Sequence, residues 1–61
     1  MNDEVKSTMR ELVFVDEIRN DLKDRFERNE LDYDWTSQIL DILSMRLMDL
    51  EDEVINQVKN S

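Results

Sequence analysis

Apolar residues recur every three or four positions along almost the whole chain, and no Gly or Pro interrupts them. Spacings of three and four place side chains on one face of an α-helix. Without Gly or Pro, the chain lacks the strongest helix breakers and the Asn-Gly and Asp-Gly pairs that form tight β-hairpins. The pattern therefore predicts an all-α fold and argues against a sheet.

The first half of the chain reads as one helix, over residues 3–28. Asp3 and Glu4 in its first turn and the arginines in its last turn suit the helix dipole. Asp21 and Asp24 each precede an arginine by four positions, which favours ion pairs on the helix surface. The apolar stripe also contains Ile18, and the residues that we expect in the seam of a helical hairpin are Val5, Met9, Leu12, Val15, Leu22 and Phe26.

The stripe breaks at residues 29–34, where we predict a turn. Asn29 can adopt the left-handed conformation at a helix C-terminus, and Asp32 or Asp34 can cap the next helix. A single bent helix is the alternative. The second predicted helix covers residues 35–59, and its seam residues recur in heptads, as in packed helices: Leu40, Leu43, Leu47, Leu50 and Val54.

Sixty-one residues predict one domain, an antiparallel helical hairpin spanning residues 1–61. A chain of this size buries only about 60% of the surface that its unfolded form exposes, so it needs additional stabilisation. Cys and His are absent, which excludes disulfides and a His/Cys zinc site. Association remains, and we expect a homodimer in which two hairpins form a four-helix bundle. Because 39% of the residues are charged, disorder of the isolated chain is the alternative.

Several apolar residues lie off the predicted seam. A hairpin covers only one face of each helix, and each large apolar side chain left in water forfeits about 1.5–3 kcal/mol. We assign these residues to a dimer interface or, because Met suits adaptable surfaces, to the binding of a different protein. They are Phe14, Ile42, Met45, Met48, Ile55 and Trp35.

Four residues, Trp35 among them, each have two interpretations. Trp35 and Tyr33, near the turn, either cover the open end of the bundle or anchor a partner protein. Arg19 and Arg46 lie in or beside the apolar stripes. They either extend to water or form ion pairs that set the register, for example between Arg46 and an acid of the first helix.

The net charge of −8 argues against direct binding to nucleic acid and to anionic membranes. A second interpretation of this charge is imitation of DNA phosphates, which would block a nucleic-acid-binding protein. Six of the eight bases precede residue 30, so such a surface would lie on the second helix. Its candidate residues are Asp41, Asp49, Glu51, Asp52 and Glu53.

The sequence offers no catalytic chemistry. Without His, Cys or Gly, it has no nucleophile–base pair and no phosphate-binding loop. Asp32-x-Asp34-x-Thr36 begins like a calcium loop, but Ser37 and Leu43 occupy the positions that require Gly and Glu. We therefore expect no enzyme activity, catalytic residue, cofactor, metal site or small-molecule substrate.

The charged residues 1–11 predict no secretory signal, and the longest apolar run, residues 12–15, is too short to span a membrane. A cytoplasmic protein is expected. The absence of Gly, Ala and Pro, whose codons are GC-rich, fits an AT-rich genome such as that of a small phage. The leading hypothesis is a homodimeric regulator, adaptor or inhibitor that binds another protein. The alternatives are an acidic DNA mimic and a structural subunit or assembly factor of a larger particle.

Overall fold

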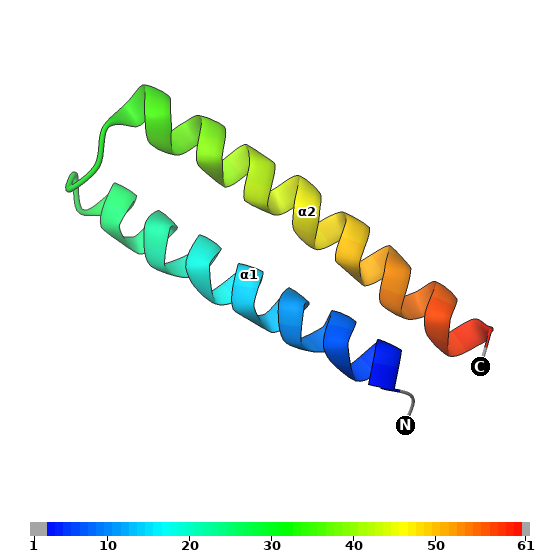
Figure 1. The fold of residues 1–61 in the computed structure, drawn as a ribbon. Helices are drawn as coiled ribbons and strands as arrows, with labels where there is room; N and C mark the ends of the chain where they lie inside the picture. The colour runs from blue at the N-terminus through cyan, green and yellow to red at the C-terminus, as the bar shows by residue number, and fades with distance from the viewer. Residues whose placement is uncertain (1–2, 61) are drawn as a thin grey trace.

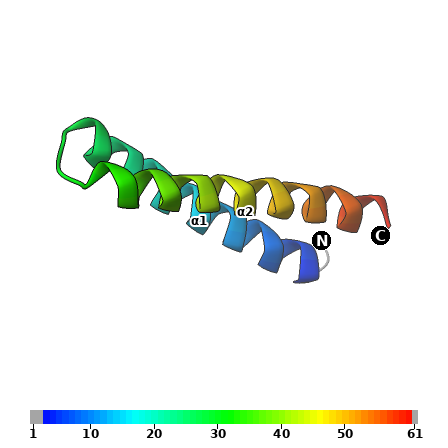
Figure 2. The same ribbon diagram turned by 90° about the horizontal axis from the view of Figure 1, so that it is seen from above.

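The protein is an antiparallel hairpin of two helices, seen here in a computed structural model that describes residues 3–60 (Figure 1). Helix α1 spans Asp3–Glu27 and helix α2 spans Tyr33–Lys59. The helices cross at a shallow angle, and both termini lie at the end opposite the turn (Figure 2). The molecule is elongated, with extents of 44 × 15 × 11 Å. The predicted all-α hairpin is confirmed.

Helix α1 ends in a Schellman motif built without Gly. Asn29 has a φ of 61°, in the left-handed region. The Asn29 N–H donates to the Phe26 carbonyl and the Glu30 N–H to the Arg25 carbonyl, each at 3.0 Å. These two bonds satisfy carbonyls that the helix end would otherwise leave unpaired. Asn tolerates this conformation better than most residues, which explains how the chain turns here.

Helix α2 begins at Tyr33, two residues earlier than the sequence predicts. The cap is Asp32, whose Oδ2 accepts a hydrogen bond of 3.0 Å from the backbone N–H of Trp35. Asp34 therefore lies in the first turn of the helix, where its charge suits the dipole. The connection is shorter than the predicted turn for this reason.

The seam between the helices repeats every seven residues on both sides. Val15, Leu47 and Leu50 form the buried cluster, with Leu12 and Leu43 packed against it. Spacings alternate between three and four, as expected when two helices pack along their length. The buried and half-buried seam residues are Val5, Thr8, Leu12, Val15, Arg19, Leu22 and Phe26 of α1, and Thr36, Leu40, Leu43, Leu47, Leu50, Val54 and Gln57 of α2.

Met9 is not in the seam, contrary to the expectation from sequence. Its side chain is 42% exposed, whereas Thr8 is only 8% exposed. The alternation Val5, Thr8, Leu12 continues the heptad, and Met9 falls one position beyond it. Thr8 can occupy the seam because its hydroxyl donates to the Glu4 carbonyl at 3.0 Å and is thereby satisfied within its own helix.

Within residues 3–60, neither helix combines the length and the apolar content that crossing a bilayer requires.

Candidate interaction surface

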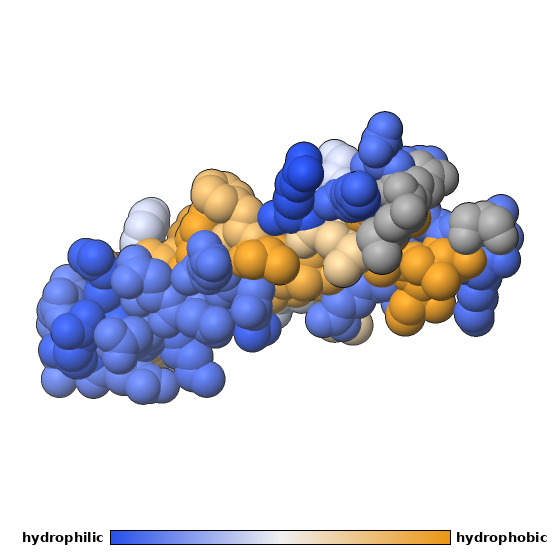
Figure 3. Space-filling view, turned by 90° about the horizontal axis from the view of Figure 1, so that it is seen from below, coloured by the Kyte–Doolittle hydropathy of each residue, from blue (hydrophilic) through white to orange (hydrophobic). Residues whose placement is uncertain are grey.

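The most prominent surface feature is the amount of apolar side chain left in water. Among residues 3–60, only four apolar residues are buried, and eleven large ones are exposed. Figure 3 views the hairpin from the α1 side: hydrophilic residues cover the turn end, while apolar surface extends from the middle toward the termini. The exposed residues are Met9, Val13, Phe14, Ile18, Tyr33, Trp35, Ile42, Met45, Met48, Ile55 and Val58.

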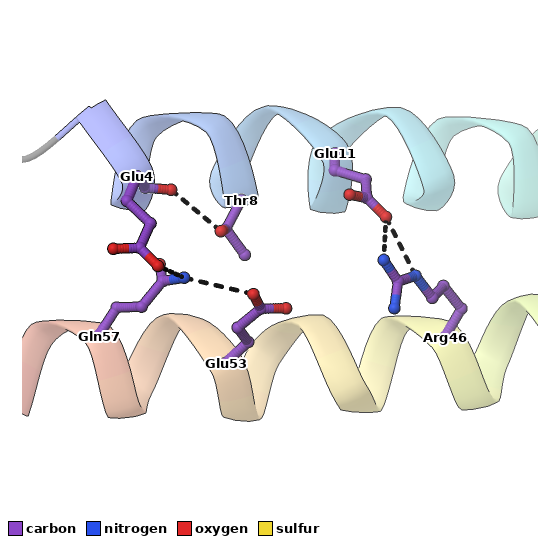
Figure 4. Close-up of polar contacts among 6 residues, drawn as sticks. All are labelled: Glu4, Thr8, Glu11, Arg46, Glu53 and Gln57. Atoms are coloured by element: carbon purple, nitrogen blue, oxygen red, sulfur yellow. Dashed lines mark hydrogen bonds and ion pairs between the residues drawn. The ribbon is translucent and has the colours of Figure 1, made fainter.

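An ion pair between the helices marks one side of the seam. Nε of Arg46 donates to Oε2 of Glu11 at 3.0 Å, and Nη2 donates to the same oxygen (Figure 4). The pKa of Arg46 is raised, first by this hydrogen bond and then by the charge of Glu11, with smaller contributions from Glu53 and Asp49. Of the two interpretations of Arg46, the alternative one, an ion pair with an acid of the first helix, is therefore present. Arg19 instead pairs with Asp16 on its own helix, at 3.0 Å.

Gln57 links the helices on the same side of the seam, nearer the termini. Its Nε2 donates to Glu53 at 3.3 Å and to Glu4 at 3.5 Å (Figure 4). Its Oε1 is buried and has no hydrogen-bond partner among residues 3–60. We call the depression around these side chains the acidic hollow, and its lining residues are Glu4, Asp49, Asp52, Glu53, Asn56, Gln57 and Asn60.

Apolar residues continue this side of the seam toward the turn. Ile18 follows Glu11 by seven residues, and Ile42 precedes Arg46 by four, so each lies on the same side of its helix as the ion pair. Both are exposed, Ile42 by 60%. We name this side the ion-pair flank, and it comprises Glu4, Glu11, Ile18, Arg25, Trp35, Ile39, Ile42, Arg46 and Glu53.

The opposite side of the seam carries a separate apolar ridge. Val13 follows Glu11 by two residues and Met48 follows Arg46 by two, and two helical residues turn about 200°. Both therefore point away from the ion-pair flank. We name this side the methionine flank, and its ridge comprises Met9, Val13, Met48 and Ile55, all exposed.

A depression lies on the methionine flank toward the turn. Ser44, in its lining, precedes Met48 by four residues and so shares its side of α2. We call it the turn-side hollow. Its lining combines two apolar, two basic, one acidic and one hydroxyl residue: Phe26, Leu40, Arg19, Lys23, Glu27 and Ser44.

The residues predicted to form one interface lie on two flanks. Met48 and Ile55 belong to the methionine flank, and Ile42 and Trp35 belong to the ion-pair flank. Phe14 lines a depression formed by α1 alone, together with Met9 and Val13. Met45 points outward between the two flanks. A step of three residues advances about 300°, so the series from Ile42 to Met48 winds around α2 and forms no single ridge. Sequence reasoning did not assign Met9 and Ile18 to this surface, because it placed both in the apolar stripe of the first helix. Each lies one position away from a heptad residue, which was a usable signal.

The two aromatic residues at the turn are both exposed. Trp35 is 54% and Tyr33 69% exposed. The Tyr33 ring lies 5.6 Å from the Phe26 ring, tilted by 42°, and so extends the end of the seam. Trp35 lies on the ion-pair flank, three turns before Arg46.

The five acids considered as a DNA mimic do not share one face. Asp49, Asp52 and Glu53 line the acidic hollow together with Glu4, a residue of the other helix. Glu51 precedes Glu53 by two residues and points to the other side of α2, and Asp41 is not in the lining. Among residues 3–60, no three acidic side chains are placed to hold a metal ion.

Comparisons with family models, with curated proteins and with solved structures find no match to this chain.

Proposed function

We propose that the protein is a non-catalytic, homodimeric binding module that acts on another protein as a regulator, adaptor or inhibitor in a cytoplasm. The observation that carries the proposal is that more large apolar side chains are exposed than buried among residues 3–60. Exposed apolar surface of this extent is typical of interaction sites. Two flanks of different character leave room for a second copy and for a partner.

The methionine flank suits the second copy. Its ridge lies toward the termini and its turn-side hollow lies toward the turn. When two hairpins pack antiparallel about a two-fold axis, the ridge of each faces the hollow of the other. Such packing forms a four-helix bundle and leaves the acidic hollows of both copies, which lie on the opposite flank, outside the interface.

Sedimentation equilibrium of paired variants tests this interface. Met48→Asp places a charge in the ridge and should convert a micromolar dimer to monomer, because the charge loses its water on association. Met45→Asp is the matched control: Met45 is as exposed as Met48, 66% against 65%, but points outward. It should leave the dimer intact. Circular dichroism verifies that each variant retains its helices.

The proposed dimer is wrong if the unaltered protein sediments as a folded monomer at micromolar concentration. Equal effects of the two substitutions would contradict the assignment of the interface to the ridge of the methionine flank.

The acidic hollow favours a second candidate function, that of a DNA mimic. Its four carboxylates come from both helices and lie around one depression. A mimic should bind a basic DNA-binding protein in competition with DNA and lose affinity steeply with added salt. Binding that does not depend on salt contradicts it.

A further inference from the structure

We propose that the ion-pair flank docks one amphipathic helix of a partner protein, a helix that is apolar over the half facing the turn and basic over the half facing the termini. The inference rests on the proposed protein-binding function and names the chemistry of its partner. Its basis is the separation of apolar and acidic residues along a single flank.

The separation follows the length of the hairpin. Toward the turn, the flank presents Ile18, Ile42 and Trp35, which are 37%, 60% and 54% exposed. Arg25, one heptad after Ile18, lies beside them, and its charge is paired with Asp21 at 3.2 Å. The Glu11–Arg46 ion pair lies in the middle. Toward the termini, the acidic hollow takes over, with Glu4 and Glu53 held by Gln57. A ligand of matching length therefore meets apolar surface at one end and carboxylates at the other.

The length of the flank fits a helix. Two packed helices present a groove along their seam, and an amphipathic helix fills such a groove with residues spaced by three and four. Trp35 and Glu53 are eighteen residues apart in α2, which corresponds to about 27 Å of helix axis. A partner helix of about 18 residues spans that distance.

The charge distribution selects a basic partner over a second copy. Each hairpin carries a net charge of −8. Two copies meeting on this flank would either bring their acidic hollows together or press one hollow against Ile18 and Ile42 of the other. Like charges repel in the first arrangement, and carboxylates lose water without a partner in the second. Lysine or arginine side chains remove both costs.

The charge separation also sets the direction of the docked helix. Basic residues suit the C-terminal half of a helix because of the helix dipole. The docked helix then runs in the direction of α2, from the turn toward the termini.

A synthetic peptide pair tests the proposal directly. The probe is an 18-residue helical peptide with leucines spaced by three and four in its N-terminal half and four lysines in its C-terminal half. The matched peptide replaces the four lysines by glutamates. We expect fluorescence anisotropy to show binding of the lysine peptide to the full chain, at least about ten-fold tighter than the glutamate peptide. Equal affinities overturn the proposal.

Variants of the protein test whether the peptide binds to the ion-pair flank. Ile42→Asp should lower the affinity for the lysine peptide by about ten-fold or more, since it puts a charge among the apolar contacts. Met45→Asp, three residues further on and pointing outward, should not. The double variant Asp49→Asn, Glu53→Gln should also weaken binding and should reduce its dependence on salt.

The other outcomes each identify a different occupant. If Ile42→Asp leaves peptide affinity unchanged while the double variant abolishes it, charge alone binds the peptide and the helix-docking proposal is overturned. If Ile42→Asp dissociates the dimer, a second copy occupies this flank and the proposal is again overturned. If the unaltered protein forms its dimer but does not bind the lysine peptide, this inference is overturned and the proposed dimer is not, because the dimer is measured separately by sedimentation.

Discussion

Two threonines show how single residues affect the stability of the seam. Thr8 and Thr36 both take heptad positions and are both buried, Thr36 completely. The Thr8 hydroxyl donates to the Glu4 carbonyl, but the Thr36 hydroxyl has no partner among residues 3–60. A buried hydroxyl without a hydrogen bond is destabilising because it has lost water and gained nothing in return. Thr8 therefore costs the seam little stability, and Thr36 costs it more.

Replacement of these threonines by valine should separate the two cases. Thr36→Val removes an unsatisfied hydroxyl from the seam and should raise the free energy of unfolding by about 1 kcal/mol. For a domain of this size, that corresponds to a rise in Tm of roughly 4–8 °C. Thr8→Val is the control, and it should give a smaller gain or a loss because it breaks an existing bond. Similar effects of the two changes in thermal unfolding would contradict this account.

At the scale of the elements, the ends of the helices define the hairpin. The Schellman motif at Asn29 ends α1, and the Asp32 carboxylate starts α2. Between them the chain needs only a short connection, which holds the helices antiparallel and sets the level at which Glu11 meets Arg46. The turn residues thus determine which side chains face each other along the seam.

The cap predicts a clear difference between two neighbouring aspartates. Asp32→Ala should lower the free energy of unfolding by about 1 kcal/mol, because the Trp35 N–H loses its acceptor. Asp32→Asn should restore most of the loss, since Asn caps equally well. Asp34→Ala removes only a favourable charge in the first turn, worth about 0.3–1 kcal/mol and screened by salt. Chemical denaturation at high salt, where the dipole contribution is suppressed, distinguishes the cap from the charge. Equal losses at Asp32 and Asp34 there would contradict the assignment of the cap.

The whole molecule combines exposed apolar surface on both flanks with a high net negative charge. A net charge of −8 keeps copies apart at long range, while the methionine flank offers the short-range apolar contact of the proposed dimer. The acidic hollow adds an attraction for basic partners on the other flank. Self-association and partner binding should therefore respond to salt in opposite directions.

A salt series measures this opposition. Raising the ionic strength from about 0.01 M to about 1 M shortens the Debye length from about 30 Å to about 3 Å. The dimer should become tighter, because repulsion between two acidic copies is screened, whereas the lysine peptide should bind more weakly. Sedimentation and anisotropy read out the two equilibria in the same samples. A dimer that loosens with salt would show that charge attraction, not the apolar ridge, holds it together.

The sequence by itself determined the helices, the turn and most of the seam. Helical spacing, the position of Asn29 and the choice of Asp32 or Asp34 as cap are local properties, readable from each segment alone. The predicted seam was incomplete because it was drawn from apolar residues alone. It included Met9 and left out Thr8 and Thr36, although both threonines keep the heptad spacing.

Only the tertiary structure decided where the remaining apolar and acidic residues lie relative to each other. The spacing of residues gives the angle of each side chain around its own helix axis. Which residues of the other helix share its side of the seam depends on how the two antiparallel helices pair and on their relative shift along the seam. That pairing brings Glu4 to Asp49 and Glu53 across the seam, and it places Ile18 of α1 on the same side as Ile42 of α2. The apolar surplus was visible in the sequence, and its division into two unlike flanks arises from packing the helices together.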